Sequence, residues 1–284
     1  MLPGFAYTRF ADHLASMVEL STADLDYLER MPFTIGHFSS HQTIRQKGDQ
    51  ADSCCLLLQG YLCWREAGND VDQIISIYVP GDVPDLSTYA SPAASVNLSS
   101  LGPVVIAFIP HAFFRDAALL SPAISRALSL LNLADTASLR NWIINLGSRD
   151  SLTRVAHLFC EITFRLRAVG LARDFAFASP FTQSDLAAAC GISPVHANRI
   201  VQVLRRKNLL HWQSKTVTVT DWQGLTDVAQ FDPDYLNFRE GPPLPPMRPL
   251  GPRPTEAAHT DLAAGPHPAL GSGPQTVTRW TPPG

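Results

Sequence analysis

The sequence predicts an α+β fold in four parts: a strand-rich N-terminal half, one long helix, a winged helix-turn-helix and a Pro/Gly-rich tail. Short apolar runs separated by turn residues fill positions 31–110, a spacing typical of a β-sandwich or small barrel. A stretch of 24 residues without proline or glycine follows, and then come two short helical segments and a two-stranded hairpin. The expected domains are residues 1–120, 121–148, 149–238 and 239–284.

The N-terminal half is expected to contain a short helix over residues 21–30, because Ser21 and Asp24 stand at the spacing of a capping box. Turns such as Lys47-Gly48-Asp49 and Pro80-Gly81-Asp82 separate the apolar runs that follow. The expected strands are Phe33–Phe38, Cys54–Leu58, Tyr61–Arg65, Gln73–Val79 and Val104–Ile109.

Composition and charge narrow the classes of protein. The chain has 284 residues, 45% of them hydrophobic, and a formal net charge of −3, which excludes a uniformly basic nucleic-acid coat. No apolar run approaches the roughly 18 residues that cross a bilayer, and the N-terminus has no signal-peptide apolar region. The five cysteines are odd in number and unevenly spaced, which fits a reducing compartment. We therefore expect a cytoplasmic protein without a membrane partner.

A long helix is expected over Ala123–Leu146, because a serine and a proline precede it and Gly147 follows it. Some of its many apolar residues lie at the alternating spacing of a coiled-coil seam, which then meets the polar residues Asp135 and Ser138. We expect this helix to form a homodimer through Ile124, Leu128, Leu131 and Trp142.

Two short helices joined by a tight turn are expected next. Thr182 and Asp185 stand at capping-box spacing before the first helix, and Gly191 supplies the turn. A serine cap and a proline then start the second helix, Pro194–Lys207. Its buried stripe is expected to consist of Ala197, Ile200, Val201 and Leu204. This pattern predicts a helix-turn-helix with Pro194–Lys207 as its recognition helix.

The opposite face of this second helix carries side chains that can contact base edges and phosphates. They are Val195, Arg199, Gln202 and Arg206. A hairpin follows directly over Leu209–Trp212 and Thr216–Thr220, with Lys215 at its tip, and is expected to form a wing. Residues 179–220 carry a net charge of +4 on an acidic chain, which indicates a polyanion partner. We expect that partner to be double-stranded DNA.

The order of these parts resembles the Crp/Fnr superfamily of bacterial transcription regulators over about residues 10–221. The motifs that carry the resemblance are the glycine turns and Thr182-Gln-Ser-Asp-Leu-Ala with Gly191-Ile-Ser-Pro-Val-His-Ala-Asn-Arg199. The resemblance implies an N-terminal β-roll (jelly-roll-like) that senses an effector and a long helix that forms a parallel dimer. It also implies RNA polymerase as a protein partner. We expect no catalytic residues and no resident metal or cofactor. By the same resemblance, Val195 and Arg199 read bases, whereas Ser193 and His196 contact phosphates.

The loop after Pro80-Gly81-Asp82 departs from the family members that bind cyclic nucleotides. Those members have Gly-Glu-Leu and then an Arg-Ser/Thr pair, whereas this chain has Pro84-Asp85-Leu86 and no arginine near Ser95. Proline lacks the N–H that a phosphate would use. Residues 67–114 contain no Lys or Arg, and a buried phosphate needs cationic or several N–H partners. We expect a degenerate pocket, unresponsive to cyclic AMP and with an unknown effector, around Asp82, Asp85, Leu86 and Ser95.

Other hypotheses remain open from the sequence. A haem could be bound by His37, His41 or His111. Control by another non-nucleotide effector is also an alternative. The cysteines nearest to the N-terminus lack the spacing of an iron–sulfur site. A cupin-like metal enzyme would need several convergent histidine and glutamate ligands. The last alternative is a regulator without any ligand, whose β-roll serves only as a scaffold.

Overall fold

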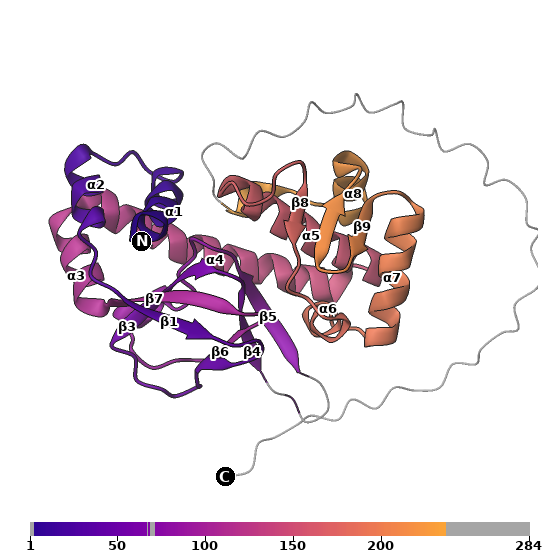
Figure 1. Cartoon of the computed structure of the whole chain (residues 1–284), viewed down its shortest axis with the longest axis horizontal. Coiled ribbons are helices and arrows are strands. Elements are labelled where there is room, and N and C mark those ends of the chain that lie inside the picture. Colours follow the sequence, from indigo (N-terminus) through magenta and orange to yellow (C-terminus); the bar gives the residue numbers. More distant parts are fainter. Residues whose placement is uncertain (1–2, 67, 69–71, 237–284) are drawn as a thin grey trace, which may run out of the picture. The chain divides into compact units, whose positions relative to one another are not determined.

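The computed structural model describes residues 3–66, 68 and 72–236, and most of its strands lie in the N-terminal half (Figure 1). The predicted Pro/Gly-rich tail, residues 239–284, lies outside the described residues. The N-terminal elements are α1 (Pro3–Ala15), α2 (Thr22–Glu29), β1 (Thr34–Phe38), β2 (Thr43–Arg45), β3 (Ser53–Gln59), β4 (Leu62–Glu66), β5 (Gln73–Tyr78), η1 (Leu86–Tyr89), β6 (Asn97–Ser100), β7 (Val104–Pro110) and α3 (His111–Leu120).

Antiparallel strands form the predicted β-roll as two sheets, with the orders β1-β7-β3 and β2-β6-β4-β5. Strand β3, at one edge of the first sheet, is apolar on both faces because both faces are covered. Cys54, Leu56 and Leu58 pack with the helices, whereas Cys55 and Leu57 pack with side chains from both sheets. Successive side chains of a strand point to opposite faces, so a strand covered on both sides reads as a continuous apolar run.

The strands predicted from apolar runs are confirmed, each within about one residue of its expected ends. The sequence does not predict β2 and β6, because their short polar segments have no apolar alternation. They form through pairing: β6 lies between β2 and β4. The sequence also does not predict α1 and α3, which cover the Cys54 face of β3 together with α4 (Pro122–Ser148).

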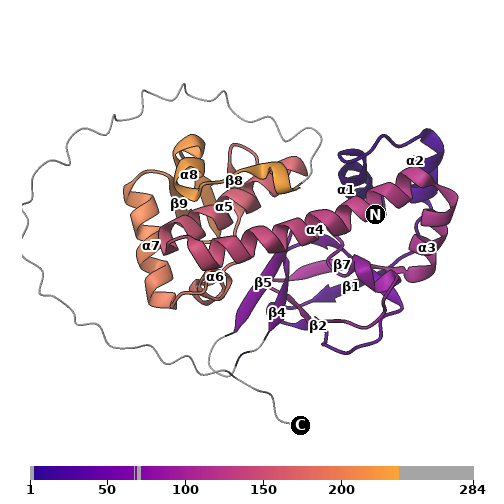
Figure 2. The ribbon, with the colours of Figure 1, turned by 180° about the vertical axis from the view of Figure 1, so that it is seen from behind.

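The long helix α4 is continuous over 27 residues and runs along the roll towards the C-terminal domain (Figure 2). Ser121 caps its start, because the serine Oγ accepts a hydrogen bond from the Ile124 N–H at 3.1 Å. The sequence predicts that Gly147 ends the helix. In the structure the helix continues through Gly147 and ends at Ser148. The chain leaves the helix at Arg149, and Asp150 caps the next one.

The C-terminal half contains the predicted helix-turn-helix and its hairpin. Its elements are α5 (Ser151–Ala168), β8 (Ala176–Ala178), α6 (Gln183–Cys190), α7 (Pro194–Arg206), β9 (Leu210–Gln213), β10 (Thr216–Val219), α8 (Trp222–Ala229) and η2 (Pro233–Leu236). The wing is a three-stranded sheet, because β8 adds to the hairpin in the order β8-β10-β9. None of the helices in the described part of the chain is both long and apolar enough to cross a membrane.

One cluster of buried side chains joins the four-stranded sheet of the roll to the C-terminal half. It contains Tyr61 and Ile77 of the roll together with Phe159 of α5 and Leu186 of α6. The Tyr61 hydroxyl also donates a hydrogen bond to the carbonyl of Ala178 in β8 at 2.7 Å. The roll therefore supports the helix-turn-helix through shared packing as well as through the chain connection.

Candidate nucleic-acid interface and effector cavity

Local capping interactions build the helix-turn-helix. The Thr182 Oγ1 accepts from the Asp185 N–H at 3.1 Å, and the Asp185 Oδ2 accepts from the Thr182 N–H at 2.9 Å, which completes the predicted capping box. Gly191 ends α6 with a φ of +63°, a left-handed conformation that glycine adopts without strain. Ser193 then caps α7, since its Oγ accepts from the His196 N–H at 3.2 Å.

Helix α7 has one buried and one open face. Ala197, Ile200 and Leu204 are buried and Val201 is half-buried, as the sequence predicts. The predicted DNA-reading residues all lie on the exposed face: Val195, Arg199, Gln202 and Arg206. Even the apolar Val195 has 64% of its surface exposed. An open strip with two arginines, an amide and a methyl-bearing side chain suits base edges in a major groove.

The remaining predicted DNA contacts flank this face. Lys215 is exposed at the wing tip, next to Ser214 with its φ of +56°. Ser193 is exposed, although its hydroxyl already caps α7. His196 is half-buried, and its Nε2 lies 2.8 Å from the Oγ of Ser151 at the start of α5. The histidine therefore also ties α7 to α5, a contact that no sequence pattern predicts.

The two aspartates predicted for the effector pocket face different partners. Asp82 is 7% exposed, and its Oδ2 lies 2.5 Å from the Arg165 Nη2. Asp85 is 1% exposed, and its Oδ2 lies 3.2 Å from the Arg45 Nε. The acidic loop is therefore neutralised by arginines that lie far from it in the sequence.

A cavity of about 80 Å³ lies between the roll, α4 and α5. The predicted residues Asp82 and Leu86 line it, but Asp85 and Ser95 do not, and Ser95 is exposed. The other titratable residues of the lining were not among the predicted pocket residues: His13, Tyr78, Asp135, Glu161 and Arg165. Three carboxylates surround one guanidinium, so the cavity walls are acidic.

Arg165 is the positive centre of this cavity. It also donates to Glu161 Oε1 at 3.4 Å and to the Ile77 carbonyl at 2.7 Å. Burial would lower the pKa of Arg165, but the Asp82 and Glu161 carboxylates outweigh it and raise the pKa above its ordinary value. Burial raises the pKa of Asp135, although its carboxylate accepts a hydrogen bond from the Tyr78 hydroxyl at 2.7 Å. The guanidinium is thus occupied by protein carboxylates and a carbonyl.

The histidines considered as haem or metal ligands have separate surroundings. His37 is exposed on β1, the His41 Nδ1 lies 3.8 Å from Asp185, and the His111 Nε2 lies 2.9 Å from the Thr88 Oγ1. Burial lowers the pKa of His111. Within the described ranges, no three His, Cys, Asp or Glu side chains are grouped closely enough to hold a metal ion.

The residues expected to form the dimer seam lie on the inward face of α4. Ile124 and Leu128 are each 1% exposed and pack with α1 and α3. Trp142 is 8% exposed, and its Nε1 donates to Glu161 Oε2 at 3.0 Å. Leu131 is half-buried and lines the cavity. This corrects the expected seam, because these side chains belong to the core of their own protomer.

A second stripe with the same alternating spacing runs along the exposed face of α4. Its members are separated by four and three residues in turn, and all are exposed: Arg126, Ser129, Leu133, Thr136, Arg140, Ile143 and Gly147. Leu133 is 59% exposed, Ile143 71%, and the adjacent Ile144 56%. This spacing keeps residues on one face of a helix and is that of a coiled-coil seam.

Comparison with known proteins identifies the C-terminal part. Residues 153–228 match the family model of the Crp-like helix-turn-helix domain. The transcriptional activator protein FnrL of Cereibacter sphaeroides is 22% identical over 230 residues, which are 78% of this chain and 90% of FnrL.

Solved structures share the fold over most of the chain. FixK2 from Bradyrhizobium japonicum has a TM-score of 0.63 at 18% identity and covers 70% of this chain and 98% of its own. The c-di-GMP responsive regulator CLP of Xanthomonas campestris has a TM-score of 0.53 at 15% identity, with 70% and 99% covered. Together with the helix-turn-helix match, these findings show that the chain carries a Crp-like helix-turn-helix domain and shares the fold of Crp/Fnr-type regulators.

Proposed function

We propose that the chain acts as a homodimer that binds a pseudo-palindromic DNA site and regulates transcription there with RNA polymerase as its partner, without an enzymatic activity. The observation that carries the proposal is the exposed face of α7, placed between a capped helix start and a lysine-tipped wing. In this assignment Val195 and Arg199 contact bases. The phosphate contacts come from Ser193, His196 and Lys215, with Gln202 and Arg206 beside them on α7.

The exposed stripe of α4 supports the proposed dimer. Leu133 and Ile143 would lie in the seam between two parallel copies, with Ile144 beside it. At 1.5 Å per residue, a helix of 27 residues is about 40 Å long, which is enough for several coiled-coil layers. Pairing through this stripe leaves the inward face of α4 on its own roll.

Selection of bound sequences from random DNA tests this proposal. We expect enrichment of two inverted half-sites about 10–10.5 bp apart, because a two-fold dimer presents its recognition helices one helical turn apart. Enrichment of a single asymmetric half-site would contradict the dimer. No enrichment at all would contradict sequence-specific binding.

The cavity is proposed not to bind cyclic mononucleotides. Its volume of about 80 Å³ is smaller than the roughly 300–1,000 Å³ of typical ligand pockets. Its guanidinium already pairs with Asp82 and Glu161. A phosphate buried beside three carboxylates would lose its hydration without gaining a free cation.

We therefore expect no saturable heat when cyclic AMP or cyclic GMP is titrated into the protein, and specific DNA binding without added nucleotide. Because CLP of Xanthomonas campestris is c-di-GMP responsive, the same titration with that dinucleotide extends the test, and we expect no heat there either. A micromolar dissociation constant for a cyclic mononucleotide, or DNA binding that requires one, would overturn the proposed degenerate pocket.

A further inference from the structure

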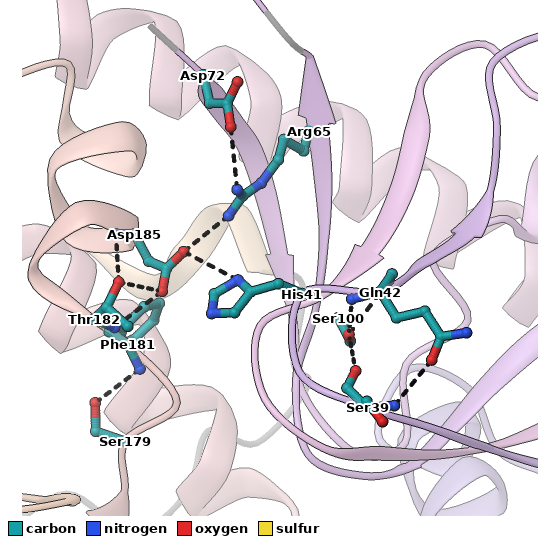
Figure 3. Close-up of polar contacts among 10 residues, drawn as sticks. All are labelled: Ser39, His41, Gln42, Arg65, Asp72, Ser100, Ser179, Phe181, Thr182 and Asp185. Atoms are coloured by element: carbon teal, nitrogen blue, oxygen red, sulfur yellow. Dashed lines mark hydrogen bonds and ion pairs between the residues drawn. The ribbon is translucent and has the colours of Figure 1, made fainter.

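The β4–β5 hairpin of the roll contacts the first helix of the helix-turn-helix directly (Figure 3). The Arg65 Nη2 at the end of β4 donates to the Asp185 Oδ1 in α6 at 2.8 Å. On the neighbouring strand, the Gln73 Nε2 donates to the Ala188 carbonyl, also at 2.8 Å. Arg65 and Gln73 lie at the same end of the hairpin, where Arg65 is opposite Ile74. Two side chains therefore hold one helix at two points of its length.

The carboxylate of Asp185 has two roles in this contact. Its Oδ2 completes the capping box with Thr182, while its Oδ1 accepts from Arg65 (Figure 3). Only 3% of the Asp185 side chain is exposed, against 22% for Arg65. His41 lies 3.8 Å from the same carboxylate, and Asp72 lies 3.3 Å from the other end of the guanidinium. Without Arg65, the buried Asp185 carboxylate would lose its closest cation. Keeping α6 packed against the hairpin would then cost free energy, because it would leave this charge buried without that partner.

The contact leaves the recognition surface open. Val195, Arg199 and Gln202 on α7 are exposed while Arg65 and Gln73 hold α6. The two helices form one packed unit, since the inward sides of both are buried in the same cluster. Fixing α6 against the roll therefore fixes the direction of α7 without covering it.

We propose that Arg65 is a positioning residue for DNA binding: through Asp185 it sets the orientation of the helix-turn-helix relative to the roll of the same protomer. The inference rests on the proposed binding of a dimer to two half-sites. Such a dimer engages both half-sites only when both recognition helices hold the required spacing. A domain that samples several orientations binds with an affinity lowered by the fraction of time spent in the competent one. Binding to a single half-site does not require a fixed spacing between the two recognition helices.

Arg65→Ala tests the proposal against a matched control, Lys47→Ala. Lys47 is also a cation of the roll, and it pairs at 3.4 Å with Glu66 on β4, with 61% of the Lys47 side chain and 46% of the Glu66 side chain exposed. For Arg65→Ala we expect about a tenfold or larger loss of affinity for a two-half-site duplex and less than about a twofold change for a single half-site. For Lys47→Ala both changes are expected to stay below about twofold. Asp185→Asn, which removes the charge on the other side of the contact, is expected to give the same split between the two duplexes as Arg65→Ala.

Amide hydrogen exchange on the free protein gives a readout that needs no DNA. We expect faster exchange in α6 of Arg65→Ala than in the wild type and in Lys47→Ala, with α4 unchanged. Equal losses on both duplexes would make Arg65 a direct phosphate contact and would overturn the positioning role. Unchanged affinity and unchanged exchange would overturn it as well. If the wild type itself bound no DNA, the proposed function would fail, whereas the exchange experiment would still decide whether Arg65 holds α6.

Discussion

Replacing Ile143 by aspartate is expected to convert the proposed dimer into monomers. Ile143 is 71% exposed in the single chain, so the substitution leaves the protomer core intact. In a coiled-coil seam, however, it would bury a carboxylate against the apolar face of the partner helix. Joining two binding modules raises the overall affinity by about 10²–10⁴-fold. We therefore expect a loss of that order for a two-half-site duplex, with single half-site binding retained.

Sedimentation velocity and a binding titration on both duplexes measure these effects. Leu119→Asp is the control, because Leu119 is an equally open apolar residue, 84% exposed, on α3 outside the stripe. It is expected to remain dimeric. An unchanged sedimentation coefficient for Ile143→Asp would place the dimer contact elsewhere, and monomers from both variants would show that the interface extends beyond α4.

The case of α4 shows why a heptad pattern alone does not identify a dimer seam. The stripe that contains Ile124, Leu128 and Trp142 has coiled-coil spacing, but it faces the roll and α5 of its own chain. Its polar interruption at Asp135 is explained by the Tyr78 hydroxyl of β5, a partner that no local pattern indicates. Both the inward and the exposed face of α4 carry apolar residues at coiled-coil spacing. The sequence therefore shows the spacing, whereas tertiary packing decides which face is left for a partner helix.

The helix-turn-helix was predictable for a physical reason: its determinants are local. The Thr182–Asp185 box, Gly191 and the Ser193 cap act within three or four residues of their own positions. The amphipathic pattern of α7 then separates the buried stripe from the exposed face. The strands of the roll were predictable where they are apolar, since burial on both faces leaves a continuous apolar run.

The charged contacts were not predictable, because their partners are distant in sequence. Arg165 and Asp82 are 83 residues apart, and Arg65 and Asp185 are 120 residues apart. The aspartates of the acidic effector loop have no cationic residue near them in the sequence, so the sequence alone indicates that they are unpaired. The spacing of Glu161 and Arg165 at i, i+4 within a buried helix was the one local signal for this cluster.

Replacing Arg199 by alanine is expected to weaken binding to the selected DNA site by about 1–3 kcal/mol, or about 5- to 150-fold. Arg199 is exposed on α7, so the fold does not depend on it. Its planar guanidinium can bond two acceptors on one guanine edge, whereas alanine leaves those acceptors without a partner. Binding to random DNA is expected to change little, because that binding comes from phosphates.

Lys215→Ala is the matched comparison, since it also removes one exposed cation, but from the wing tip. A phosphate contact is the same on every sequence, so this variant is expected to weaken specific and random DNA alike and to reduce the salt slope by about one. Filter-binding or anisotropy titrations at several salt concentrations measure both effects. The opposite pattern would be equal losses on both DNAs for Arg199→Ala and a loss only on the selected site for Lys215→Ala. That result would assign the base contact to the wing, because only a contact to base edges depends on the DNA sequence.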